Sequence, residues 1–135
     1  MQTNSSRFIN FWLFTLAIIV LLMIAVGGLT RLTESGLSMV DWKLFMGVIP
    51  PISQADWIKL FEDYKQYPEY QIKNVNMNLD GFKYIFWWEY GHRVLGRIIG
   101  LVFVIPFIYF SLKKSFTKSE YIFFITLLLL GSIQG

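Results

Sequence analysis

Near the start of the chain lies a long run of apolar residues without one charged side chain. This run limits the possible folds of the chain more than any other feature of the sequence. Residues 9–29 contain only Asn10 and Thr15 as clearly polar side chains. The run of about 21 residues would span roughly 31 Å as a helix, which matches the hydrocarbon core of a bilayer. It is too long for a typical signal-peptide core, and no convincing cleavage site follows. We therefore predict a membrane-spanning helix at about 9–29.

Two further apolar blocks follow. Residues 94–112 carry Arg97 as their only charge, close to the upstream end, and Pro106, which kinks a membrane helix without ending it. The block that begins at about residue 121 is only about 15 residues long, or roughly 22 Å of helix. We predict a second spanning helix at about 94–112 and the truncated start of a third, with a short re-entrant tail as the alternative.

The charges predict the orientation of these helices. Lys113, Lys114 and Lys118 lie in the short connection between the second and third blocks, which is typical of a loop on the inner side. The N-terminus is then also inside, and residues 31–93 form a large outer loop. The remaining basic residues form no nucleic-acid-binding stripe, and the absence of cysteine excludes disulfides and thiolate metal sites in this chain.

The outer loop is rich in aromatic side chains, which need a packing partner or a membrane interface. Ser53 and Asp56 form a capping-box pattern ahead of a helix at about 54–66. The apolar face of that helix is expected to carry Trp57, Leu60, Phe61 and Tyr64. Asn78 can cap another helix, which we expect to run without a break into the second membrane block.

The residues that could take part in chemistry lie at the start of the second membrane block. His92 is the only histidine of the chain, and Glu89 precedes it by one helical turn. Gly96 and Gly100 follow His92 on the same face. A histidine above a glycine strip suits a planar macrocycle whose iron is held by an imidazole nitrogen. The alternatives are close helix packing at the glycines and a hydrogen-bonding or proton-relay role for the histidine.

Each of the charged side chains near His92 allows two interpretations. Arg93 and Arg97 could neutralise the propionates of a macrocycle, or serve as an ion-pair partner for Glu89 and as an interface anchor. Glu89 could move a proton or stabilise a cationic intermediate, but a salt bridge with Arg93 is the simpler interpretation.

Several stretches of the chain, taken together, resemble the heme A synthase family in the form found in mitochondria and alphaproteobacteria. The matching stretches are residues 27–38 (Gly27-Gly28-Leu29-Thr30-Arg31-Leu32-Thr33-Glu34-Ser35-Gly36-Leu37-Ser38), 42–51, 68–70 (Pro68-Glu69-Tyr70) and 89–97 (Glu89-Tyr90-Gly91-His92-Arg93-Val94-Leu95-Gly96-Arg97). The resemblance implies an all-α membrane protein, a bundle of eight transmembrane helices in two similar halves. This chain would supply the first two helices, the outer loop and part of the third helix.

The resemblance also implies a reaction and a set of site residues. A porphyrin-ring methyl group of heme O, the substrate, would be oxidised to a formyl group to give heme A for cytochrome oxidase, and heme b would be a bound cofactor. His92 matches a histidine that is an axial ligand of heme iron, and Glu89 matches a glutamate implicated in catalysis. The partner histidines are expected beyond Gly135, so we expect this piece alone to be inactive.

The same resemblance sets expectations for partners and location. Heme O, membrane lipid, heme O synthase, cytochrome oxidase assembly proteins and a second copy of the chain are the expected partners, without nucleic acid. The short N-terminus, with Arg7 as its only charge, does not resemble a mitochondrial transit peptide, which favours a bacterial inner membrane. The alternatives are a cytochrome b-like electron-transfer subunit and a non-enzymatic membrane assembly factor in which His92 is structural.

Overall fold

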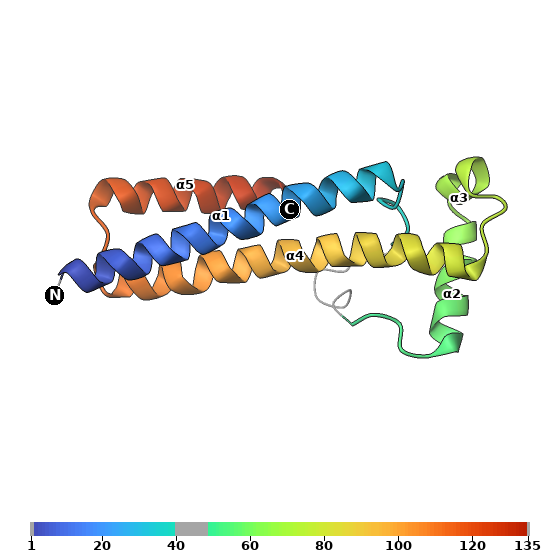
Figure 1. Cartoon of the computed structure of the whole chain (residues 1–135), viewed down its shortest axis with the longest axis horizontal. Helices are drawn as coiled ribbons and strands as arrows, with labels where there is room; N and C mark the ends of the chain where they lie inside the picture. The colour runs from blue at the N-terminus through green and yellow to red at the C-terminus, as the bar shows by residue number, and fades with distance from the viewer. Residues whose placement is uncertain (1, 40–48, 135) are drawn as a thin grey trace. The chain divides into compact units, whose positions relative to one another are not determined.

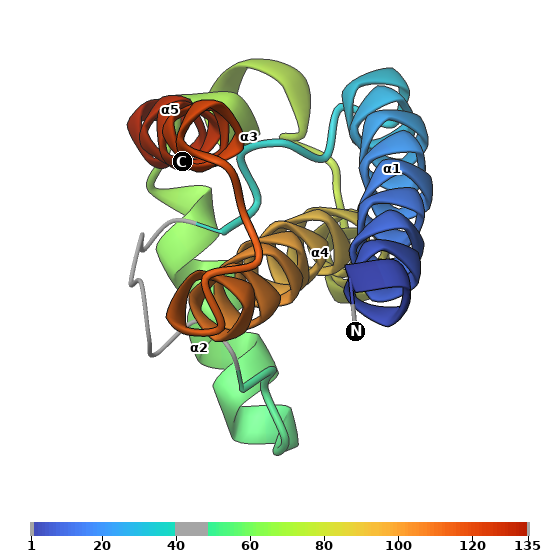
Figure 2. The same ribbon diagram turned by 90° about the vertical axis from the view of Figure 1, so that its left-hand side faces the viewer.

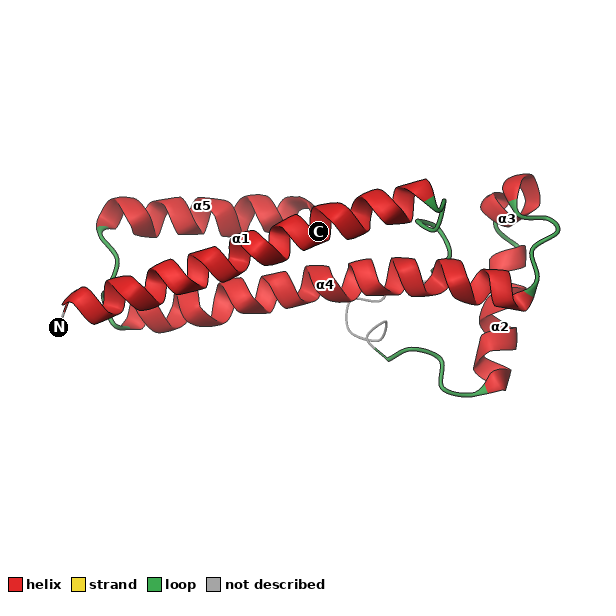
Figure 3. Ribbon diagram, viewed as in Figure 1, coloured by secondary structure: helices red, strands yellow, loops and turns green. Residues whose placement is uncertain are grey.

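The computed structural model describes residues 2–39 and 49–134, and every regular element within those ranges is a helix. Figures 1 and 3 show α1 (Gln2–Leu32), α2 (Gln54–Lys65), α3 (Pro68–Lys73), α4 (Leu79–Leu112) and α5 (Lys118–Gln134). The prediction of an all-α chain is therefore confirmed for the described residues. Most of the 42–51 stretch used in the resemblance lies outside them.

Within the described ranges, two helices are long and apolar enough to cross a membrane. They are Ser6–Leu32, with a mean hydropathy of 2.6, and Leu79–Leu112, with a mean hydropathy of 2.1. α4 runs unbroken from Leu79 through Pro106, as the sequence predicts. In both helices most side chains are exposed, as expected for apolar surfaces that face lipid or further protein. The two predicted spanning helices thus have the length and composition that crossing a membrane requires.

The chain divides into two compact units. The first consists of the residues up to Leu22 and those from Leu95 onward. Figure 2 looks at the end of this unit where α4 turns into α5. Its core is an aromatic cluster, in which the Trp12 indole N–H donates a hydrogen bond of 2.7 Å to the Val102 carbonyl of α4. The buried members are Trp12, Leu16, Phe107, Phe110 and Phe124.

The second unit, Met23–Val94, has a separate aromatic core where α2 packs on the start of α4. Its buried members are Trp57, Phe61, Tyr64, Phe82, Ile85 and Phe86, with Leu60 packed against them. The predicted apolar face of α2 is therefore confirmed. Burial raises the pKa of the Tyr64 phenol, whose oxygen accepts a 2.8 Å hydrogen bond from the Asn74 amide, so this side chain stays protonated.

Both predicted helix starts have side-chain caps. The Ser53 hydroxyl accepts a hydrogen bond from the Asp56 amide, and the Asp56 carboxylate accepts one from the Ser53 amide in return. These reciprocal bonds satisfy amides that have no partner inside α2. The Asn78 side chain accepts a bond of 2.8 Å from the Gly81 amide at the start of α4.

The end of α1 directs the chain toward the site described below. The Ser35 amide donates to the Thr30 carbonyl at 2.9 Å, and the Glu34 amide donates to the Arg31 carbonyl at 3.2 Å. This is a Schellman motif, and its left-handed position is Glu34, with φ of 51°. A glycine is the usual residue there because a Cβ is unfavourable in that conformation.

We predict that Ser53→Ala loosens α2 by about 1 kcal/mol, since the Asp56 amide loses its partner. Amide hydrogen exchange of α2 in the membrane-embedded protein should then be roughly fivefold faster. Gln54→Ala, at an exposed neighbouring position, is the control and should leave exchange unchanged. Equal exchange in the two variants would contradict a stabilising cap.

Acid should weaken the same cap in a defined pH window. Hydrogen bonds from Ser53 lower the pKa of the Asp56 carboxyl from its ordinary value of 3.8. A lowered folded-state pKa means that the contribution is fully present above 3.8 and is lost as the pH falls through the folded value. Exchange protection of α2, corrected for intrinsic rates, should stay constant from about pH 7 to about pH 5. It should fall only when the pH drops below the ordinary pKa of the Asp56 carboxyl. In Asp56→Asn the acid-side fall should disappear, and a fall already complete at about pH 5 in the unaltered protein would contradict the assignment.

Candidate functional site

His92 lies on α4 directly against a glycine of α1. A Cβ built on Gly27 would stand 3.0 Å from His92 Nε2 and 3.5 Å from its Cδ2. The half-buried imidazole therefore turns its Nε2 edge toward the α1 backbone. α1 and α4 therefore approach closely at Gly27, whereas a Cβ on Gly28 would meet open space.

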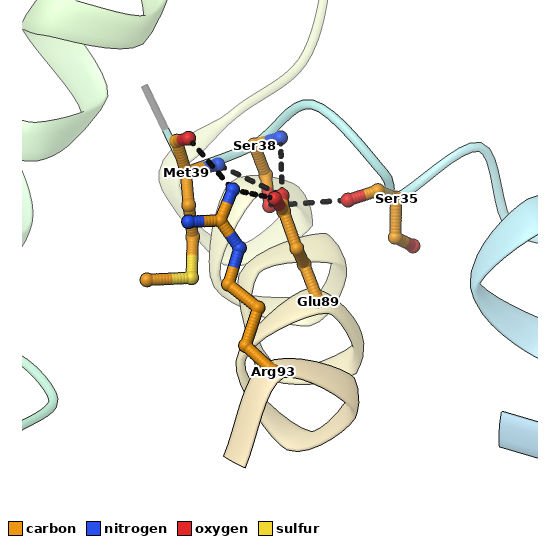
Figure 4. Close-up of polar contacts among 5 residues, drawn as sticks. All are labelled: Ser35, Ser38, Met39, Glu89 and Arg93. Carbon is orange, nitrogen blue, oxygen red and sulfur yellow. Dashed lines mark hydrogen bonds and ion pairs between the residues drawn. The ribbon is translucent and has the colours of Figure 1, made fainter. Parts of the chain in front are cut away.

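Glu89, one turn before His92, is buried with only 4% of its surface exposed. Figure 4 shows its carboxylate facing the segment that follows α1. The Oε2 atom accepts hydrogen bonds from the Ser38 amide at 2.7 Å, the Ser38 hydroxyl at 2.7 Å and the Met39 amide at 2.8 Å. One carboxylate oxygen thus fastens this segment to α4.

The other carboxylate oxygen binds Arg93. Arg93 Nη2 lies 2.6 Å from Glu89 Oε1 and also donates to the Met39 carbonyl at 3.3 Å. The predicted Glu89–Arg93 salt bridge is therefore confirmed, and the buried charge is both paired and hydrogen-bonded. We call these four residues, Ser38, Met39, Glu89 and Arg93, the Glu89 clamp.

The Glu89 clamp determines what the carboxylate can do chemically. Both of its oxygens accept hydrogen bonds, and one of them also pairs with the Arg93 guanidinium. A carboxylate in this arrangement supplies a fixed negative charge one turn from His92.

The sequence predicted the ion pair but missed Ser38 and Met39. Their amide donors leave no mark on side-chain type, so no pattern of residues could have shown them. The only available signal was the density of hydroxyl residues in the last turn of α1 and just after it, of which Thr30, Ser35 and Ser38 are buried.

Comparison with known proteins assigns the family. The model of the cytochrome oxidase assembly protein family matches residues 10–135. The chain belongs to that family. A heme A synthase of Azorhizobium caulinodans is 49% identical over 98% of this chain, and one of Nitrosospira multiformis is 51% identical over 94%. A heme A synthase of a Caulobacter species is 44% identical over the whole chain.

The family resemblance expected from the motifs is thus confirmed, for a chain that is shorter than its relatives. The matched regions make up 38%, 36% and 39% of the lengths of those relatives. No solved structure matches the chain.

The donor set of this family member fits a haem better than a bare metal ion. Among residues 2–39 and 49–134 no group of three or more histidine, cysteine or acidic side chains is placed to hold an ion. A single imidazole suffices as a protein ligand when a porphyrin supplies the equatorial nitrogens itself. The Nε2 edge of His92 faces the α1 backbone at Gly27, so α1 and α4 would have to separate there before an iron could bind this nitrogen.

Arg97 and Gly100 belong to the first unit, apart from His92 and the Glu89 clamp. Arg97 is half-buried and has interactions of its own. A Cβ on Gly100 would meet open space. The role of Arg97 and of the glycine strip beside a macrocycle therefore stays a prediction.

We predict that Glu89→Ala is the most damaging single change in the Glu89 clamp. It leaves the buried amide of Ser38 and the partly buried amide of Met39 without a partner, at a cost of about 1–3 kcal/mol for an unsatisfied buried donor and less for the partly buried one. Arg93→Ala should cost less, since three hydrogen bonds to Oε2 remain. The measurement is resistance of the membrane-embedded protein to limited proteolysis as temperature rises.

The matched control is Glu62→Ala, which removes an exposed glutamate that is paired with Lys65 at 2.7 Å. An exposed pair of this kind contributes little to stability. If Glu89→Ala proved no more sensitive to protease than Glu62→Ala, the clamp would have no stabilising role.

Proposed function

We propose that the protein to which this chain belongs is a heme A synthase, which oxidises the ring methyl of heme O to a formyl group. The observation that carries the proposal is the match of nearly the whole chain, with its single histidine and the glutamate one turn before it, to relatives named heme A synthase. Glu89 is buried and paired with Arg93, one turn from His92. The relatives named heme A synthase make this reaction the best match for such a site.

In this proposal His92 holds iron through its imidazole nitrogen. The substrate heme O would bind here, and a heme b would act as cofactor elsewhere in the whole protein. Haem supplies the redox chemistry when bound. His92 orients the macrocycle, and α1 at Gly27 limits how far the imidazole can move.

Glu89 would act through charge rather than through proton transfer. Its carboxylate is held in place by donors from Ser38, Met39 and Arg93. A fixed anion close to the reacting ring stabilises positive charge that develops during oxidation, without any reorganisation of the site. We therefore retain Glu89 as a catalytic residue and assign it an electrostatic role.

The two arginines are proposed to act differently from each other. Arg93 is committed to Glu89 and to the Met39 carbonyl. Arg97, four residues later on α4, is the better candidate for a charge-assisted bond to a propionate.

We place the protein in the inner membrane of a bacterium, with N-terminus and the Lys113–Lys118 connection on the inner side and residues 31–93 outside. The apolar lengths of α1 and α4 and the bacterial relatives support this placement. Heme O synthase and cytochrome oxidase assembly proteins are the proposed partners.

We predict that His92→Ala abolishes heme A formation by the full-length protein in a host that supplies heme O. The haem content of membranes would be extracted and separated by chromatography. Gly91→Ala is the control, because it alters the adjacent position of α4, where a Cβ meets open space. Heme A should form with Gly91→Ala and be absent with His92→Ala.

Two results would contradict the proposal. Equal amounts of heme A from both variants would indicate that His92 has only a structural role. A bound b-type haem, with no heme A from the unaltered protein, would favour a cytochrome b-like electron-transfer subunit.

A further inference from the structure

We propose that Ser38 is a positioning residue for the reaction: its hydroxyl group fixes the Glu89 carboxylate, and with it the negative charge one turn from His92. The inference rests on the proposed function, in which that charge assists the oxidation of heme O. It assigns a role in the reaction to a serine that lies 51 positions before Glu89, in the segment that follows α1.

Ser38 contacts the carboxylate through two of its own groups. Its backbone amide and its side-chain hydroxyl both donate to Glu89 Oε2, each at 2.7 Å. The Met39 amide donates to the same oxygen at 2.8 Å. Figure 4 shows these donors converging on the carboxylate. Among the described residues, Ser38 thus supplies two of the three donors to this oxygen.

The hydroxyl group of Ser38 is committed to Glu89. A serine hydroxyl carries one hydrogen, so it donates fully to a single acceptor. Its oxygen lies 2.7 Å from Glu89 Oε2 but 3.2 Å from the carbonyl oxygen of Ser35. The shorter contact is the one to the charged acceptor, and hydrogen bonds to charged groups are the stronger ones. Since Ser38 is only 3% exposed, bulk water does not compete for this hydrogen.

Arg93 holds the other oxygen of the carboxylate, with its Nη2 atom 2.6 Å from Glu89 Oε1. Because Glu89 and Arg93 both belong to α4, their ion pair cannot fix the carboxylate relative to another part of the chain. The donors from Ser38 and Met39 do so. Without the hydroxyl, the two amides still attach the segment to α4, but the carboxylate gains freedom to follow the arginine.

The loss of this freedom is what makes the hydroxyl useful to the reaction. A charge stabilises a transition state best when it is already in place and does not have to reorient. In the proposed function Glu89 stabilises positive charge that develops during oxidation. A carboxylate that is held less firmly therefore stabilises that charge less. A lost hydrogen bond to a charged group corresponds to a roughly tenfold or larger effect.

Ser35 provides a matched control in the same segment. Its side chain is fully buried, as that of Ser38 nearly is. Its hydroxyl lies 2.5 Å from the Thr33 hydroxyl and 3.3 Å from the Thr33 carbonyl oxygen, so it bonds within the segment and not to Glu89. Ser35→Ala and Ser38→Ala each remove one buried hydroxyl. A difference between the two variants therefore reports the bond to Glu89.

The first measurement is made on the full-length protein in membranes of a host that supplies heme O. Heme A is determined relative to the amount of protease-resistant, folded protein, which removes any effect on folding alone. We expect the yield of Ser38→Ala to be roughly tenfold or more below that of the unaltered protein. Ser35→Ala should give nearly the unaltered yield.

The second measurement reads the carboxylate itself and needs no turnover. Infrared spectra are recorded of the purified full-length protein carrying isotope-labelled glutamate, and the labelled carboxylate band that disappears in Glu89→Gln belongs to Glu89. The frequency of that band depends on the hydrogen bonds that the two oxygens accept. We expect the band to shift in Ser38→Ala and to keep its position in Ser35→Ala.

The proposal requires both changes in Ser38→Ala. Equal heme A yields from the two serine variants would overturn the positioning role and leave the proposed function intact. A lower yield without a band shift would place the loss elsewhere and would also overturn it. No heme A from the unaltered protein would instead remove the proposed function, and the role of Ser38 in the reaction with it.

Ser38→Cys covers the case in which Ser38→Ala does not accumulate in the membrane. Its thiol occupies the place of the hydroxyl but is a weak donor. A shifted Glu89 band together with a yield below that of Ser35→Ala would support the proposal. A band position and a yield equal to those of Ser35→Ala would overturn it.

Discussion

The carboxylate of Glu89 is the interaction on which the local structure around His92 depends. A buried charge is tolerated only when it is paired and its lone pairs are satisfied, and Glu89 meets both conditions with donors from Ser38, Met39 and Arg93. Two of these donors are amides from a segment of irregular backbone, which would otherwise need water or another acceptor. The charge of Glu89 therefore holds the segment that follows α1 in place. It also provides a fixed anion one turn from His92.

The membrane helices explain why such a connection is needed. α1 and α4 are apolar along most of their length, and lipid does not drive two apolar helices together as water does. Specific contacts have to set their register. In the second unit these are the Glu89 clamp and the approach of Gly27 to His92, and in the first unit the Trp12 indole, which donates to the Val102 carbonyl. Polar bonds and a small residue thus set how α1 packs on α4 within each unit.

The sequence predicted those features whose physical cause lies within a short stretch of chain. The apolar blocks, the capping pattern at Ser53 and Asp56, and the spacing of Glu89 and Arg93 all act over one or a few turns, and the helices and the ion pair followed from them. The contacts between distant stretches could not be read in the same way. Nothing in the residue types indicates that Ser38 and Met39 donate to Glu89 across some fifty positions, or which glycine of the pair faces His92. Which glycine faces His92 depends on the rotation of α1 about its axis. The sequence of an almost uniformly apolar helix does not indicate that rotation.

The central claim is that His92 binds haem iron, and a ligand exchange tests it most directly. In the full-length protein, His92→Met should keep haem bound while replacing a nitrogen ligand by a thioether, which raises the reduction potential and alters the absorption and magnetic spectra of the iron. That change in one haem, with the properties of any other haem preserved, is the result we predict. Spectra and potential identical to those of the unaltered protein would show that His92 does not touch the iron.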